Sequence, residues 1–136
     1  MTRKTLTGVL GVLSMMLVLG TSSGSAAPQT AATSRVMREK LTHAQRLLEA
    51  ITTSDFALLE RESQALSKVT SDLGWMVFKT PEYRRQSDTF LRATEDLVAA
   101  AKQHDLDLAA MHYVSLTMSC YQCHRYVKNM RIAGKP

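Results

Sequence analysis

Two cysteines and a histidine lie close together near the C-terminus, in the run Cys120-Tyr121-Gln122-Cys123-His124. At this C-x-x-C-H spacing, two thiols can form thioether bonds to the two vinyl groups of a porphyrin. The histidine that follows the second cysteine can then place its imidazole beneath the iron as an axial ligand. The motif therefore predicts one covalently bound haem c, attached to Cys120 and Cys123, with His124 as an iron ligand.

Three other uses of these residues are less compatible with their surroundings. A thioredoxin-type redox pair lies at a helix N-terminus, where the dipole favours a thiolate, whereas the helix expected here places the pair near its end. A structural zinc site needs four ligands, and His43, His104 and His112 show no paired spacing that would supply them. A disulfide between Cys120 and Cys123 would close a loop too short to stabilise the fold much.

The N-terminal segment predicts export. Arg3 and Lys4 precede an uncharged apolar run over residues 5–20, and small residues follow over 22–27. This order is that of a secretory signal peptide, which we expect to be cleaved after Ala26. The alternative is an uncleaved membrane anchor, but the apolar run is short for a membrane span and contains glycines. We therefore expect a periplasmic or otherwise exported protein without a membrane span after cleavage.

Composition argues for a globular domain and against a nucleic-acid partner. The 136-residue chain is 45% hydrophobic and 21% charged, which excludes a disordered or repetitive chain. The formal net charge of +5 becomes smaller once Arg3 and Lys4 are removed with the signal peptide. Nucleic-acid binding needs a dense basic stripe with aromatic residues, and only 6% of the residues are aromatic. The sequence contains no Ser-His-Asp pattern and no glycine-rich phosphate loop, so we do not expect an enzyme.

Four amphipathic segments predict an all-α fold. Apolar residues recur in each at spacings of three and four, and capping residues mark the ends. The first predicted helix is capped by Ser34 or Thr33 and runs to Ala50 or Thr52, and the second runs from the cap Ser54 to Leu73. The third runs from Pro81, behind the cap Thr80, to Gln103 or His104, and the fourth runs from the cap Asp105 to just before Gly134. Helices of this length with short connections pack as antiparallel neighbours, which predicts an up-down-up-down four-helix bundle. The expected organisation is a signal peptide over 1–26, a flexible lead-in over 27–33 and a haem domain over 34–136.

The core faces of the first and fourth helices follow from the same spacing. In the first helix the expected core residues are Val36, Met37, Leu41, Ala44, Leu47, Leu48 and Ile51. In the fourth they are Leu106, Ala110, Tyr113, Thr117, Cys120, His124 and Val127. Tyr113 and Thr117 precede Cys120 by two turns and one turn, so we expect them to line the haem pocket.

Antiparallel packing brings the start of the first helix to the end of the fourth. Met37 lies near the centre of the first helix's apolar stripe, and its thioether suits a low-spin iron that transfers electrons, so we predict it as the second ligand. The alternative is that Met37 only fills the core. If Leu41 covered the iron instead, the site would be five-coordinate and would bind nitric oxide or carbon monoxide. His43 is another possible ligand, at the edge of the stripe.

Six basic residues are expected at the same end of the bundle: Arg35, Arg38, Lys40, Arg125, Lys128 and Arg131. The haem propionates carry about two negative charges and would neutralise part of this charge. The remainder could steer an acidic redox partner or form a solvated face.

The chain resembles the class II c-type cytochromes, the cytochrome c′ group, in carrying its haem motif on the last of four helices. Smaller matches to the family are Ser119, Lys128, Trp75 and Phe78. The family commonly has an aromatic residue three positions after the histidine, where this chain has Val127. The resemblance implies an electron carrier with one haem, whose sixth ligand, in six-coordinate members, is a methionine of the first helix. It also implies a redox partner protein and a homodimer formed through the first two helices.

Overall fold

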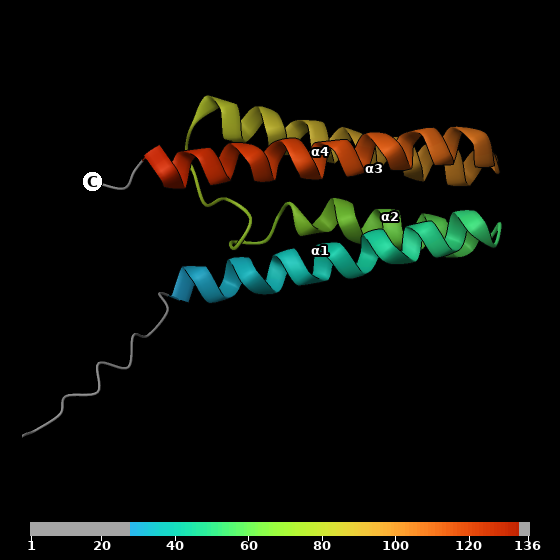
Figure 1. Ribbon diagram of the computed structural model, residues 1–136. Helices are drawn as coiled ribbons and strands as arrows, with labels where there is room; N and C mark the ends of the chain where they lie inside the picture. The colour runs from blue at the N-terminus through green and yellow to red at the C-terminus, as the bar shows by residue number, and fades with distance from the viewer. Residues whose placement is uncertain (1–27, 134–136) are drawn as a thin grey trace, which may run out of the picture.

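The computed structural model describes residues 28–133, with side chains over 31–131. Over this range it contains four helices: α1 (Pro28–Thr52), α2 (Phe56–Val69), α3 (Pro81–Gln103) and α4 (Leu106–Ala133). Successive helices run in opposite directions, and α4 returns to lie beside α1 (Figure 1). The predicted all-α, up-down-up-down four-helix bundle is confirmed. No helix within this range is sufficiently long and apolar to cross a membrane.

The beginning of α1 differs from the prediction. The predicted signal peptide over 1–26 lies outside the described residues, but the expected lead-in over 27–33 is helical from Pro28 onward. Proline is accepted in the first turn because its missing N–H has no partner there. Thr33 and Ser34 therefore lie within α1 and do not cap it.

The predicted caps of α3 and α4 are confirmed. The Thr80 hydroxyl accepts a hydrogen bond from the Tyr83 N–H at 3.1 Å. The Asp105 carboxylate accepts one from the Leu108 N–H at 2.9 Å. Between the two helices, His104 takes a left-handed φ of 53° and ends α3. These local signals fix the residue at which α4 begins, and therefore how far along the bundle the C-x-x-C-H motif lies.

The helix α2 is shorter than predicted at both ends. Its cap is Asp55, whose carboxylate accepts the Leu58 N–H at 2.9 Å. Ser54, the predicted cap, has a φ of 58° and belongs to the preceding turn. The helix ends at Val69 instead of Leu73, because the chain turns toward α1 before it reaches Gly74.

The turn after α2 lies against the start of α1. The Asp72 carboxylate accepts the Gly74 N–H at 2.7 Å and a hydrogen bond from Arg35 at 2.7 Å. A Cβ atom on Gly74 would lie 2.7 Å from the carbonyl carbon of Ala32, which is closer than a Cβ atom can approach. The absence of a side chain at Gly74 therefore lets the connection between α2 and α3 pack directly on α1.

The core face of α1 is rotated relative to the prediction. Leu41 and Leu48, expected in the core, are 59% and 48% exposed, whereas Lys40 is only 5% exposed. Val36 and Leu47 are fully buried. The buried face of α1 is centred near Val36 and Leu47, at one side of the predicted stripe. Residues at the other side of the stripe therefore face solvent, and Lys40, which lies close to Leu47 around the helix, is enclosed.

The core face of α4 also differs from the prediction. Ala109, Leu116 and Ser119 are buried, whereas Ala110, Thr117 and His124, expected inside, are exposed. The reason is that apolar residues occur around the whole circumference of this helix. Its exposed large apolar side chains are Met111, Val114, Met118 and Tyr121. Periodicity therefore could not select the buried face of α4.

Candidate functional site

A cavity of about 470 Å³ lies at the end of the bundle where α1 begins and α4 ends. Its walls come from α1, from the connection between α2 and α3, from the first turn of α3 and from α4. All of these segments meet at one end of the bundle (Figure 1). The volume is in the range of sites for small molecules and cofactors.

The α4 wall of the cavity carries Cys123 and His124. Burial raises the pKa of the Cys123 thiol; the Cys120 thiol raises it further, while the charge of Lys40 opposes the increase. Burial, and then the charge of Lys40, lowers the pKa of His124. His124 lines the cavity although part of its side chain is exposed. An imidazole that is held neutral retains a lone pair for a metal ion.

Cys120 lies one turn before Cys123 and packs against the hydrophobic core. It is partly buried and does not itself line the cavity. The neighbouring Ser119 is 2% exposed, and its hydroxyl donates to the Leu116 carbonyl at 2.7 Å. Both cysteines are free thiols and lie far from the N-terminus of α4. Neither the helix dipole nor the raised pKa of Cys123 favours the thiolate that a thioredoxin-type pair requires.

The α1 wall of the cavity carries Met37, which is half-buried. Met37 and His124 therefore line the same cavity from two different helices, as predicted for the two ligands of an iron. Leu41, the alternative distal residue, is exposed and does not line the cavity. Among the α1 residues that line the cavity, Met37 is the apolar one.

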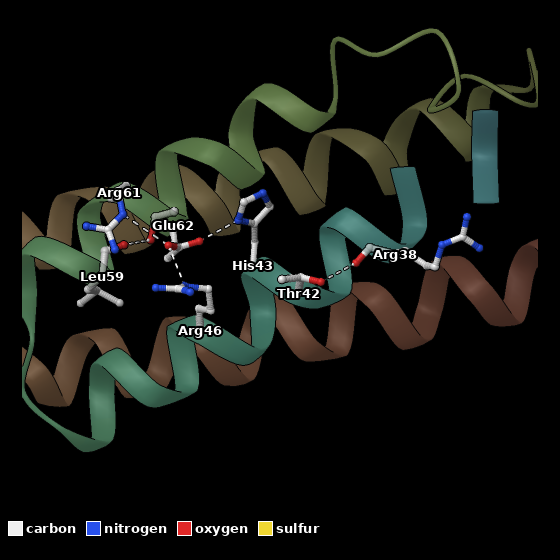
Figure 2. A network of polar contacts seen from close by, with 8 residues as sticks. Arg38, Thr42, His43, Arg46, Leu59, Arg61 and Glu62 are labelled. Carbon is white, nitrogen blue, oxygen red and sulfur yellow. Dashed lines mark hydrogen bonds and ion pairs between the residues drawn. The ribbon is translucent and has the colours of Figure 1, made fainter. Parts of the chain in front are cut away.

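His43, the other possible ligand, belongs to an ionic network between α1 and α2 (Figure 2). Its Nδ1 donates to the Glu62 carboxylate at 2.7 Å, and the same carboxylate accepts from Arg46 at 3.0 Å. Arg61 lies 3.4 Å from it. Burial raises the pKa of Glu62, but the hydrogen bond from His43 and the three nearby positive groups outweigh it and lower the pKa below its usual value. His43 therefore has a structural partner and lies outside the cavity lining.

Tyr113 and Thr117, expected to line the pocket, do not line the cavity. Tyr113 packs against the core. Thr117 is exposed, and its hydroxyl donates to the Tyr113 carbonyl at 2.9 Å. Both residues lie too far along α4 from the end of the bundle at which the cavity opens.

The buried aromatic residues Trp75 and Tyr83 form one wall of the cavity. The Tyr83 hydroxyl donates to the Trp75 carbonyl, and the Trp75 indole N–H donates to the Ser87 hydroxyl at 3.1 Å. Burial, followed by the nearby Cys123 thiol, raises the pKa of Tyr83. The hydroxyls of Thr80 and Tyr126 form a hydrogen bond of 2.7 Å that joins this wall to α4. Apolar spacing along the third helix predicts that Tyr83 faces the core, and it is 2% exposed. Its place in the cavity wall follows only from the tertiary structure.

Lys40 is a second lining residue whose individual role the sequence analysis did not identify. Its Nζ atom lies 4.1 Å from the ring centroid of Phe90 and 4.9 Å from that of Trp75. The sequence signal is a lysine that lies four residues after Val36, three after Met37 and seven before Leu47, all spacings that put residues on one side of a helix. Periodicity alone would place such a residue either at the edge of the core or in solvent.

The donor set around the cavity fits a c-type haem. Two free thiols and an imidazole follow one another along α4, a thioether lies on α1, and aromatic side chains form the remaining wall. In the part of the chain that the structure describes, no three His, Cys, Asp or Glu side chains form a group that could hold a bare metal ion. Comparison with protein-family models, with curated proteins and with solved structures gives no match to this chain.

Proposed function

We propose that the chain is an exported, periplasmic electron carrier with one haem c attached to Cys120 and Cys123. The proposed iron ligands are His124 and Met37. One observation carries the proposal: Cys123 and His124 of the C-x-x-C-H motif line a cavity of about 470 Å³ to which α1 contributes the Met37 thioether. This arrangement supports a haem domain more directly than either the motif or the bundle would alone.

Each proposed ligand has a distinct role. Cys120 and Cys123 would tether the cofactor, and His124 and Met37 would hold its iron; a thioether ligand favours the reduced form of the iron. The bound haem would supply reversible one-electron chemistry. Trp75 and Tyr83, both 2% exposed, keep water from the inner wall of the cavity.

We infer an electron carrier and not a cysteine-dependent enzyme. A nucleophilic cysteine needs a lowered thiol pKa or an adjacent base that removes its proton. Burial instead raises the pKa of Cys123, and burial also lowers the pKa of His124. The two residues therefore lack the thiolate–imidazolium character of an activated pair.

The proposal includes partners. An electron carrier requires a redox partner protein, and Arg125, Lys128 and Arg131 are exposed near the cavity, so we expect an acidic partner to dock there. A homodimer through the first two helices stays a prediction. Leu41 and Leu48 would be its apolar contacts on α1.

Intact-mass measurement of the protein purified from a periplasm that attaches haem tests the proposal. We expect the mass of the chain to increase by one haem, and the reduced visible spectrum to show the sharp, split bands of a six-coordinate c-type centre. Cys120→Ala combined with Cys123→Ala should abolish the covalent addition, whereas Met118→Ala, on the exposed face of α4, should retain it. A wild-type chain without added haem would refute the proposal. A single broad reduced band with rapid carbon monoxide binding would identify a five-coordinate gas-binding protein instead.

A further inference from the structure

Lys40 is a buried cation in the wall of the cavity. It is 5% exposed, and no other lysine or arginine is buried in the described part of the chain. The other basic residues near this end have different surroundings. Arg35 pairs with Glu39 at 2.9 Å and with Asp72 at 2.7 Å, and Lys128 is exposed. Lys40 is therefore distinct from the solvated cations expected around a haem.

The ammonium of Lys40 is held by aromatic rings. Its contacts are the faces of Phe90 and Trp75, at 4.1 Å and 4.9 Å from the ring centroids. Within residues 31–131 it forms no ion pair with a carboxylate. A buried cation without an anion is unfavourable unless the neighbouring space supplies compensating negative charge. Because Lys40 lines the cavity, an anionic group of a molecule bound there would supply that charge in addition to the aromatic faces.

Lys40 also lies beside the proposed ligand residues, because it lines the same cavity as Met37, Cys123 and His124. Lys40 follows Met37 by three residues, so the two side chains are neighbours on the surface of α1. The positive charge therefore lies at the proposed haem site and not at its solvated rim.

We propose that Lys40 sets the reduction potential of the haem by acting as a fixed positive charge in the cavity wall. This inference rests on the proposed function. Ferric iron carries one more positive charge than ferrous iron, so a fixed cation in a low-dielectric wall stabilises the reduced state. The redox step transfers one electron from a reduced partner protein to ferric iron, and no covalent bond is made or broken. The negative propionates of the cofactor would serve as the counter-charge of Lys40.

Spectroelectrochemical titration of the haem-loaded protein tests this role. We expect Lys40→Met to lower the midpoint potential by at least 59 mV, which corresponds to a tenfold change in the one-electron reduction equilibrium. Lys40→Gln, neutral but polar, should lower it similarly, while Lys40→Arg should restore most of the wild-type potential. Lys128→Met removes an exposed cation from the same end of the bundle. Its effect should be smaller and should disappear at high salt, because solvent and ions screen exposed charges.

Three results would overturn the inference. One is that Lys40→Met and Lys128→Met shift the potential equally. Another is that Lys40→Arg lowers it as far as Lys40→Met. The third is conversion of Lys40→Met to a high-spin spectrum, which would make Lys40 an iron ligand. Intact mass and circular dichroism, recorded for every variant, separate these results from failure of the proposed function, in which the wild type itself lacks haem.

Discussion

At the residue scale, the proposed function depends on Met37, which lines the same cavity as His124. Met37 is half-buried, whereas Leu41, one turn further along α1, is 59% exposed. A thioether ligand makes the iron low-spin and six-coordinate, and its loss opens a coordination position. Under the proposed function, Met37 would therefore decide between electron transfer and the binding of small gases.

We expect Met37→Ala to convert the reduced haem to a high-spin, five-coordinate form that binds carbon monoxide rapidly. The measurement is the ferrous visible spectrum with and without carbon monoxide. Leu41→Ala is the matched control, since it shortens an exposed side chain on the same helix and should leave the spectrum unchanged. An unaltered ferrous spectrum in Met37→Ala would exclude Met37 as a ligand.

At the element scale, Glu62 joins α2 to α1. Its carboxylate is buried and accepts from His43 and Arg46, whose side chains are 28% and 47% exposed (Figure 2). Solvent screens the arginine, so the hydrogen bonds to a charged acceptor account for most of the stabilisation. This network holds the middle of α1 in the orientation that places Met37 and Lys40 on the cavity.

Glu62→Gln should lower the free energy of unfolding by about 1–2 kcal/mol at neutral pH, because a charged acceptor is lost from a buried site. The pKa of Glu62 is lowered in the folded state. Its contribution is therefore complete above the unfolded-state pKa of about 4.3 and is lost as the pH falls through the folded-state pKa. Urea denaturation at several pH values should show the difference between wild type and Glu62→Gln shrinking on acidification. Glu95→Gln, at an exposed position on α3, is the control and should change the free energy of unfolding little at any pH. If Glu62→Gln lowered the free energy of unfolding by the same amount at every pH, the electrostatic explanation would be wrong.

At the scale of the whole molecule, the helices form a ring in which α1 and α4 make the smallest contact. The cavity lies between their ends. A group bound covalently to α4 and coordinated by α1 would join these two helices where direct side-chain packing is least extensive. Binding to the folded state alone stabilises that state, so haem attachment should strengthen this end of the bundle most.

Hydrogen exchange measures this effect. In the variant that combines Cys120→Ala with Cys123→Ala, amides of residues 33–40 and 123–131 should exchange faster than in the haem-loaded wild type. Amides around the turn between α1 and α2, at the far end, should change much less. Equal acceleration at both ends would show that the cofactor does not act as a local connection between α1 and α4.

The sequence by itself determined the number, direction and approximate limits of the helices, because these depend on local chemistry. Thr80 and Asp105 cap α3 and α4 through their own side chains, and short connections require antiparallel neighbours. The C-x-x-C-H motif was equally visible, since its meaning lies in residue type and spacing. The start of α1 was not predicted, because Pro28 permits a helix without requiring one.

Only the tertiary structure decided which face of α1 and which face of α4 is buried. Packing centred the buried face of α1 near Val36 and Leu47, at one side of the predicted stripe, so it enclosed Lys40 and left Leu41 in solvent. In α4 the apolar residues surround the helix, and packing placed Cys123 on the cavity and Thr117 outside it. Periodicity defines a range of possible rotations about a helix axis, whereas the shape and volume of the neighbouring helices select one of them.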